Sequence, residues 1–260
     1  MDERPRLLEV DMLNVHLGTP RRLILKDVGL AMTAGETLGL VGESGSGKST
    51  LAKTLVGVHR PSSGSIRFGG RECLLAKGKE RARLRREIQY IPQDPYSSLD
   101  PRRTIGETIA EALDPRRPRV SAYRQRIVEL LECVRIDGSS LDRHPREFSG
   151  GQRQRIAIAR ALAVEPSLIV ADEITSALDL STQAEVLNLL ADLKRSMGLT
   201  LIFVSHDLAV VRSISDSLLV LLHGEVVESG SAQKVFDAPA SDYTRTLIDS
   251  APGGPGFSLD

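Results

Sequence analysis

The stretch "LVGESGSGKST", residues 40–50, places three glycines between a hydrophobic run and the start of a helical pattern. The preceding run, "ETLGLV" at 36–41, is typical of a buried strand, and the apolar residues Leu51, Leu55 and Val58 recur at helical spacing. A glycine turn between strand and helix leaves backbone N–H groups uncovered at a helix N-terminus, which carries about half a positive charge. Such groups can curl around an anion, so the stretch predicts a phosphate-binding site.

Four residues of this stretch fit the phosphate-loop pattern G-x-x-x-x-G-K-[ST], namely Gly42, Gly47, Lys48 and Ser49. Kinases, GTPases and motor ATPases share this loop, so the pattern predicts nucleotide binding without deciding the class of protein. The plainer interpretation is a glycine turn with an incidental lysine. The strand and helix patterns on either side argue against it.

The composition of the chain excludes several classes of protein. Its 260 residues include 34 Lys and Arg and 34 Asp and Glu, so we expect no general attraction to nucleic acid and no nucleic-acid partner. The two cysteines, Cys73 and Cys133, are far apart and indicate neither a zinc site nor a disulfide framework. No apolar run reaches the ~18 residues that span a bilayer. Any membrane role is therefore expected to come through a partner.

Short strand-like runs alternate with helical stretches along most of the chain. They occur at 7–17, 23–32, 63–70, 86–93, 167–172, 200–206 and 217–224. The last three are the pattern of a parallel sheet covered on both faces, and the first two indicate an antiparallel layer. We therefore predict an α/β fold, a P-loop NTPase core with a mostly parallel sheet and an N-terminal antiparallel β layer.

A helical segment interrupts this alternation between residues 94 and 165. Stretches 104–113, 121–134 and 150–164 have helical apolar spacing, and Ser121 is predicted to cap the middle helix. One face of that helix is expected to be buried through Ile127, Leu130, Leu131 and Val134.

The chain is predicted to be one domain. Residues 1–93 and 166–250 form its α/β core, and 94–165 form a helical subdomain that proline-containing loops allow to move as a unit. The Gly/Pro-rich tail at 251–260 is predicted to be disordered.

The run "SLIVADE" ends a buried strand in two carboxylates, Asp172 and Glu173. Carboxylates at such a position are costly unless a cation or a polar site receives them. Beside a triphosphate site the natural cation is Mg²⁺, which takes oxygen ligands. Asp172 is expected to hold the metal with Ser49, and Glu173 to polarise an attacking water.

A second glycine-rich turn, "FSGGQRQR" at 148–155, opens another helix and offers a further anion-binding N-terminus.

With these motifs in order, the sequence resembles the ATP-binding cassette ATPases over nearly its whole length. The matching residues are the phosphate loop, a glutamine loop at Gln93 in "IPQDP", the signature "SGGQ", the run "LIVADE", the sequence "SALD" ending at Asp179, and His206 in "FVSHD".

The resemblance implies which residues bind ATP and Mg²⁺. In that family two domains pair head to tail, and each ATP lies between the phosphate loop of one and the signature of the other. Glu173, His206 and Gln93 would be catalytic, contacting water, γ-phosphate and metal. Metal ligands would be Ser49, Gln93 and Asp172. The implied nucleotide-binding residues are Gly42, Glu43, Ser44, Gly45, Ser46, Gly47, Lys48, Ser49, Thr50, Ser149, Gly150, Gly151, Gln152 and Asp179.

Two further segments, 90–109 and 235–252, look like those of peptide- and nickel-type import ATPases, the second through the ending "P-x-x-x-Y-T-R-x-L". This implies an ATPase that energises a membrane importer of peptides, nickel or similar small solutes. It would sit peripherally on the cytoplasmic face of the inner membrane, held by transmembrane permease subunits. A second ATPase subunit, identical or related, and indirectly a periplasmic or extracellular solute-binding protein would complete the system. No cysteine follows Cys133, so no iron–sulfur centre is expected.

Three departures from the family pattern leave questions open. Phe148 stands where leucine is usual, Ile174 replaces a usual proline, and the segment 14–25 lacks the aromatic residue that commonly stacks on adenine. His16 could take that place or be an ordinary strand residue, so GTP use stays open.

Three other functions compete with transport. The first is an accessory ATPase of a soluble enzyme complex, as in phosphonate degradation. The second, a DNA-maintenance clamp, predicts a long coiled-coil insertion or a basic surface, and the sequence has neither. The third, a small-molecule kinase, gives no role to "SGGQ".

Overall fold

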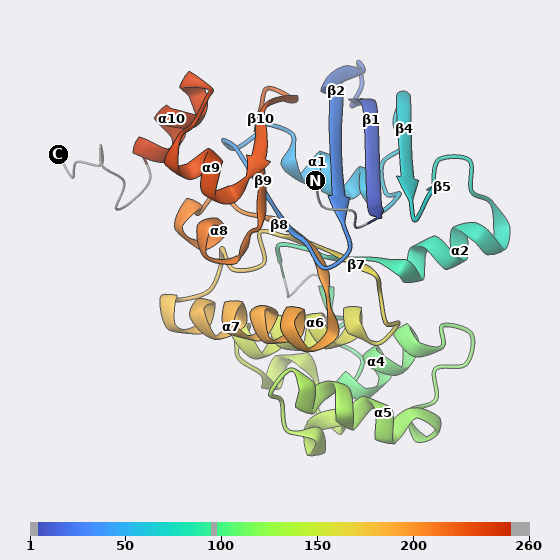
Figure 1. The fold of residues 1–260 in the computed structure, drawn as a ribbon. Coiled ribbons are helices and arrows are strands. Elements are labelled where there is room, and N and C mark those ends of the chain that lie inside the picture. Colours follow the sequence, from blue (N-terminus) through green and yellow to red (C-terminus); the bar gives the residue numbers. More distant parts are fainter. Residues whose placement is uncertain (1–4, 95–97, 251–260) are drawn as a thin grey trace.

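The computed structural model describes residues 5–94 and 98–250 (Figure 1). The predicted disorder of the tail at 251–260 lies outside these residues.

A six-stranded sheet forms the centre of the molecule, with the strand order β10-β9-β3-β8-β7-β6. Its strands are β3 (Thr37–Val41), β6 (Ile88–Ile91), β7 (Leu168–Asp172), β8 (Thr200–Val204), β9 (Ser217–Leu222) and β10 (Glu225–Ser231). All neighbours run parallel except β9 and β10. Every residue of β3, β7 and β8 is buried, as expected for parallel strands covered on both faces.

A second, antiparallel sheet has the order β2-β1-β4-β5. Its strands are β1 (Arg6–Leu17), β2 (Arg22–Thr33), β4 (Ser63–Phe68) and β5 (Arg71–Glu72). Its inward face includes Leu8, Val10, Leu13 and Val15 of β1, which are all buried. The predicted α/β fold, with a mostly parallel sheet and an antiparallel layer, is confirmed.

The helices cover both faces of the central sheet. In Figure 1, α4 and α5 lie below α6 and α7, while α8, α9 and α10 gather beside β9 and β10. The helices are α1 (Lys48–Leu55), α2 (Gly78–Glu87), α4 (Ile105–Leu113), α5 (Val120–Cys133), α6 (Gly150–Leu162), α7 (Leu180–Met197), α8 (Leu208–Ile214), α9 (Ala232–Asp237) and α10 (Asp242–Asp249), with 3-10 turns at Gly138–Asp142 and Pro145–Glu147.

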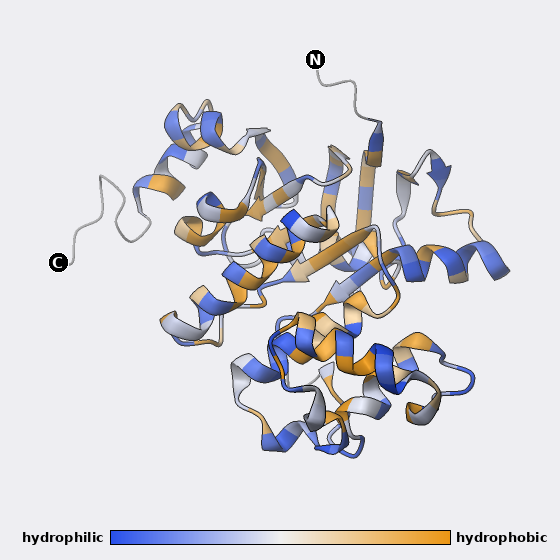
Figure 2. Cartoon of the chain, turned by 60° about the horizontal axis from the view of Figure 1, so that its bottom comes forward, coloured by the Kyte–Doolittle hydropathy of each residue, from blue (hydrophilic) through white to orange (hydrophobic). Residues whose placement is uncertain are grey.

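The side chains of β8 show how the sheet separates two hydrophobic cores. Leu201 and Phe203 belong to the core shared with the helices of the insertion, and Ile202 and Val204 belong to the core under the antiparallel sheet. Successive strand residues point to opposite faces, so one strand supplies both cores. The central strands are mostly orange in Figure 2, whereas α2 is largely blue.

Some local predictions were wrong. Helix α1 ends at Leu55, and Val58 is 65% exposed, because Gly57 turns the chain with a φ of 75°. Helix α5 begins at Val120 with Arg119 at the N-cap, so Ser121 lies inside the first turn and does not cap the helix.

Other features were not foreseen. Neither the strand β10 nor the helix α2 was predicted. The expected burial of Ile127, Leu130, Leu131 and Val134 is confirmed.

Among the described residues, no helix is both long and apolar enough to cross a bilayer.

Candidate functional site

The glycine loop between β3 and α1 has the strained backbone that its sequence predicts. Gly42, Gly45 and Gly47 have φ values of 145°, 82° and 107°, in the region that glycine alone adopts without strain. A Cβ on Gly42 would lie 2.1 Å from the carbonyl oxygen of Leu221, and a Cβ on Gly47 would lie 2.7 Å from Leu25 Cδ2. Glycine is therefore required at both positions by conformation and by space.

Lys48 is buried inside this loop. Its Nζ donates hydrogen bonds of 2.8 Å to the carbonyl oxygens of Gly42 and Glu43. Burial lowers the pKa of Lys48, and the charges of Glu173, Asp172 and Glu43 oppose that effect. An ammonium has three N–H donors, and the described residues offer acceptors for two, so one remains for an anion.

A cavity of about 440 Å³ opens beside the loop, and we call it the loop cavity. It is lined by Ile24, Ser44, Gly45, Gly47, Lys48, Ser49, Thr50, Gln93 and Glu173. The first N–H groups of α1 face no side-chain cap, since the N-cap residue is Gly47. The buried Ser46 Oγ also has no partner among the described residues. These uncovered polar groups fit an anionic ligand such as a phosphate chain.

Asp172 lies at the end of β7, across from the start of α1. Ser49 Oγ donates to its Oδ1 at 3.1 Å, and the hydroxyl of Tyr90 donates to its Oδ2 at 2.8 Å. Burial raises the pKa of Tyr90 most, followed by this hydrogen bond, so the phenol stays a donor at neutral pH.

The described residues contain no group of three or more His, Cys, Asp or Glu side chains able to hold a metal alone. The hydroxyl and carboxylate of Ser49 and Asp172 nevertheless fit Mg²⁺, which takes one or two protein oxygens and completes its shell with water and phosphate.

Glu173 is the meeting point of the predicted catalytic residues. Gln93 Nε2 donates to Glu173 Oε2 at 2.8 Å, and His206 Nδ1 lies 3.6 Å from the same oxygen. These residues follow β6, β7 and β8, and the carboxyl ends of parallel strands meet at one edge of a sheet. The structure thus brings together Lys48, Ser49, Gln93, Asp172, Glu173 and His206, although only Lys48, Ser49, Gln93 and Glu173 line the cavity.

The signature residues lie elsewhere. Ser149 caps α6, because its Oγ accepts from the N–H of Gln152 at 3.3 Å and the Gln152 side chain accepts from the N–H of Ser149 at 2.9 Å. A Cβ on Gly151 would lie 2.1 Å from Thr182 Cγ2, so the turn packs against α7. Asp179 caps α7, and hydrogen bonds from Ser181 and Thr182 lower its pKa. None of residues 149–152 or Asp179 is among the described residues that line the loop cavity.

The candidate base-binding residue is also placed outside the cavity. His16 Nδ1 lies 2.8 Å from Ser62 Oγ, which ties the ring to the loop before β4. Ile24 of β2 lines the cavity instead. Contacts from an aliphatic side chain would be less specific for adenine than stacking on an aromatic ring.

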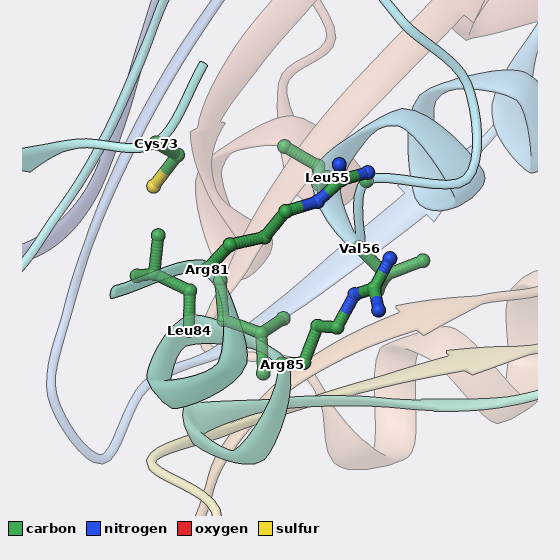
Figure 3. Close-up of a pocket in the computed structure, with 8 residues that line it drawn as sticks. Leu55, Val56, Cys73, Arg81, Leu84 and Arg85 are labelled. Atoms are coloured by element: carbon green, nitrogen blue, oxygen red, sulfur yellow. The ribbon is translucent and has the colours of Figure 1, made fainter. Parts of the chain in front are cut away.

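A second hollow, of about 70 Å³, lies between α1 and α2. Arg81 and Arg85 extend across it from α2 toward the end of α1, and Cys73 lies at its side (Figure 3). Burial raises the pKa of the Cys73 thiol to about 11, so it is protonated at neutral pH. Among the described residues that line this hollow there is no carboxylate. It therefore lacks the carboxylate and hydroxyl oxygens that Asp172 and Ser49 offer to Mg²⁺.

Sequence reasoning missed three contacts of the site. Ile24 and Tyr90 stand at alternating positions of strands, where nothing in their spacing distinguishes a cavity-lining residue from a packed one. Tyr243 accepts a hydrogen bond from the loop although the two are 200 residues apart. Tyr243 belongs to the ending P-x-x-x-Y-T-R-x-L, which was recognised in the sequence. The position of Tyr243 next to the loop, however, depends on the whole fold.

Comparisons with known proteins agree with this geometry. Residues 25–176 match the family described as ABC transporter. The chain is 45% identical over 265 residues to the oligopeptide transport ATP-binding protein OppF of Salmonella typhimurium, covering 97% of this chain and 79% of that protein.

Two solved structures are similar over most of the chain. One is cbiO1 from Clostridium perfringens, part of the ABC transporter complex cbiONQ, with a TM-score of 0.80 and 28% identity, covering 90% of this chain and 91% of that one. The other is the dimeric ATP-binding cassette MJ0796 bound to ADP and Pi, with a TM-score of 0.77 and 29% identity, covering 87% of this chain and 99% of that one.

Proposed function

Because this chain belongs to the ABC transporter family, we propose that it binds ATP in the loop cavity and hydrolyses it as the energy-coupling subunit of a peptide importer. The observation that carries the proposal is the contact of Gln93 and His206 with Glu173 at the mouth of a phosphate loop. A carboxylate at this place could also serve a kinase as its base, but a kinase would give no role to the signature residues 149–152.

The residues of the cavity divide the work of hydrolysis. The uncovered N–H groups of α1 and the third donor of Lys48 bind the phosphates and offset charge that develops on the γ-phosphate. Glu173 accepts a hydrogen bond from the attacking water and raises its nucleophilicity. Gln93 and His206 hold the Glu173 carboxylate and report whether the γ-phosphate is present. When bound, Mg²⁺, held by Ser49 and Asp172 and reached by Gln93, would neutralise phosphate charge.

The signature residues act on the nucleotide of a second ATPase subunit. Ser149 and Gly151 do not line the cavity of their own chain, and the related cassette MJ0796 was solved as a dimer with ADP and Pi. ATP in the cavity of one subunit then meets Ser149, Gly150, Gly151 and Gln152 of the other, and Asp179 lies beside that junction. Loss of the γ-phosphate removes the differential affinity for the closed pair.

The remaining components follow from the relatives. The similar protein of Salmonella typhimurium serves oligopeptide transport, and cbiO1 belongs to a transporter complex. We therefore assign the chain to the cytoplasmic face of a membrane, where it is bound to permease subunits. A solute-binding protein delivers the solute to those subunits. Residues 94–165 stay predicted as a helical subdomain that can move as a unit. These relatives do not favour an accessory role in a soluble enzyme complex.

Two substitutions test the ATPase. Lys48→Ala removes the ammonium that contacts the carbonyls of Gly42 and Glu43 and offers a third donor to phosphate, so ATP affinity should fall at least about tenfold. Glu173→Gln keeps the shape of the side chain, so ATP affinity should stay within about threefold while turnover falls at least about a hundredfold. Calorimetry and phosphate release measure the two quantities.

Lys53→Ala is the matched control, since Lys53 stands on α1 but does not line the cavity. Near-normal hydrolysis by Glu173→Gln would remove Glu173 from its proposed role.

A further inference from the structure

A contact joins the phosphate loop to the C-terminal helix α10. The backbone N–H of Glu43 donates a 3.0 Å hydrogen bond to the hydroxyl oxygen of Tyr243. Glu43 is the second residue of the loop, and its carbonyl oxygen accepts from Lys48 Nζ at 2.8 Å and from the N–H of Ser46 at 3.1 Å. The peptide that joins Gly42 to Glu43 is therefore fixed from two directions, because its carbonyl oxygen accepts from Lys48 Nζ at 2.8 Å and its N–H donates to Tyr243 of α10.

Helix α10 is itself held at its start. The carboxylate of Glu228 in β10 accepts hydrogen bonds from the N–H groups of Ala240 and Ser241, at 2.8 and 3.0 Å. Arg245 pairs with Asp242 at 2.7 Å and donates to the carbonyl oxygen of Pro239 at 3.3 Å. These contacts fix the turn that precedes Tyr243.

The same helix packs on the main hydrophobic core. Tyr243, Leu247 and Ile248 are partly buried against it. The residues of the sequence pattern P-x-x-x-Y-T-R-x-L thus have physical roles. Pro239 and Arg245 close the turn, Leu247 anchors the helix, and Tyr243 reaches the loop.

We propose that Tyr243 is a positioning residue of the phosphate loop, through which the docked C-terminal helix α10 sets the affinity of the loop cavity for ATP. This inference rests on the proposed ATPase function. The Tyr243 hydroxyl holds the first turn of the loop in the conformation that the phosphate chain needs, so that binding does not have to order it.

The direction of the hydrogen bond supports this role. The N–H of Glu43 is the donor, so it is taken by the phenol and is unavailable to phosphate, while the N–H groups at the start of α1 stay uncovered. Without the hydroxyl, the N–H of Glu43 loses its acceptor, and the peptide is free to rotate away from the Lys48 contact. Burial raises the pKa of Tyr243, which keeps the phenol neutral at physiological pH.

Tyr243→Phe tests the proposal in the full chain, because it deletes the hydroxyl and keeps the packing ring. We expect the Kd for ATP to rise about five- to tenfold, the value of one hydrogen bond, with kcat within about twofold. Hydrogen exchange should speed up at the Glu43 amide and not in α6. The control is Tyr123→Phe, since Tyr123 donates only a 3.4 Å contact to Asp114 in the helical segment.

A second variant keeps the test decisive if the first is unstable. Glu228→Gln weakens the anchor of α10 without touching the loop, and the same rise in Kd is expected. Unchanged Kd and unchanged exchange at Glu43 in Tyr243→Phe would overturn the proposal. Failure of the unmodified protein to bind ATP would instead overturn the ATPase function, and the exchange at Glu43 would still decide whether Tyr243 positions the loop.

Discussion

Glu173 is held in a backbone conformation that its side chain does not favour. Its φ is 48°, in the left-handed region, which costs a residue other than glycine about 1 kcal/mol. The N–H of Glu173 donates to the carbonyl oxygen of Val204 at 2.9 Å, and Gln93 holds the carboxylate. Strain that is maintained by contacts on both sides is common where a side chain must be aimed. Here it aims a carboxylate at the loop cavity.

Two glycines of the phosphate loop separate steric from conformational effects. Gly42→Ala should lower the free energy of unfolding by about 3 kcal/mol, because the new Cβ would meet Leu221 O at 2.1 Å in addition to the strain at φ 145°. Gly45→Ala should cost only about 1 kcal/mol, since its Cβ meets nothing within 4 Å. Urea unfolding measures the free energy of unfolding of both variants. Equal losses would contradict the clash between a Cβ at position 42 and the carbonyl oxygen of Leu221.

Among the helices, the capping of α1 differs from that of α4 and α6. Helix α4 has a capping box between Thr104 and Glu107, and α6 has one between Ser149 and Gln152. Helix α1 has no side-chain cap. Uncapped donors are a cost in the free protein that a bound phosphate chain can relieve. Helices α2, α5 and α10 also lack a side-chain cap, but α1 is the uncapped helix whose first residues line the loop cavity.

The double role of Ser149 predicts a separable effect. Thr104→Ala and Ser149→Ala should each lower the free energy of unfolding by about 1 kcal/mol, because each removes a cap. Only Ser149→Ala should abolish most of the ATPase activity of the assembled transporter. Ser149→Asp retains a capping oxygen and adds a charge that repels phosphate, so it should keep stability and lose activity. Full activity of Ser149→Asp would contradict contact of Ser149 with the nucleotide.

The sequence predicted well what is set by order along the chain. Lys48, Asp172 and Glu173 follow strands, and parallel strands bring such positions to one edge, so their meeting could be deduced. It predicted poorly what depends on packing between distant segments, such as Ile24 at the cavity or the Glu43–Tyr243 contact. The prediction that Ser121 caps a helix was wrong for a local reason. A serine near a helix start is a common cap, but α5 already begins at Val120, so Ser121 lies within its first turn.

For the whole molecule, the arrangement of motifs predicts assembly controlled by ATP. With Mg²⁺ and ATP, the Glu173→Gln variant should form a dimer that light scattering detects. The reason is that ATP is not hydrolysed and stays bound between the two subunits. Lys48→Ala should remain monomeric under the same conditions, since it loses the phosphate contacts. A dimer that forms equally without nucleotide would contradict this mechanism.

The turn between β9 and β10 fastens the phosphate loop from far along the chain. The N–H of Gly224 donates to the carbonyl oxygen of Ser46, and its own carbonyl oxygen accepts from the N–H of Lys26, both at 2.9 Å. The loop at 42–50 is synthesised early, yet this fastening is made by a residue translated about 180 positions later. In a nascent chain still on the ribosome, the phosphate loop therefore lacks this contact. We expect the loop to reach its native conformation, and ATP hydrolysis to begin, only after the rest of the polypeptide has emerged.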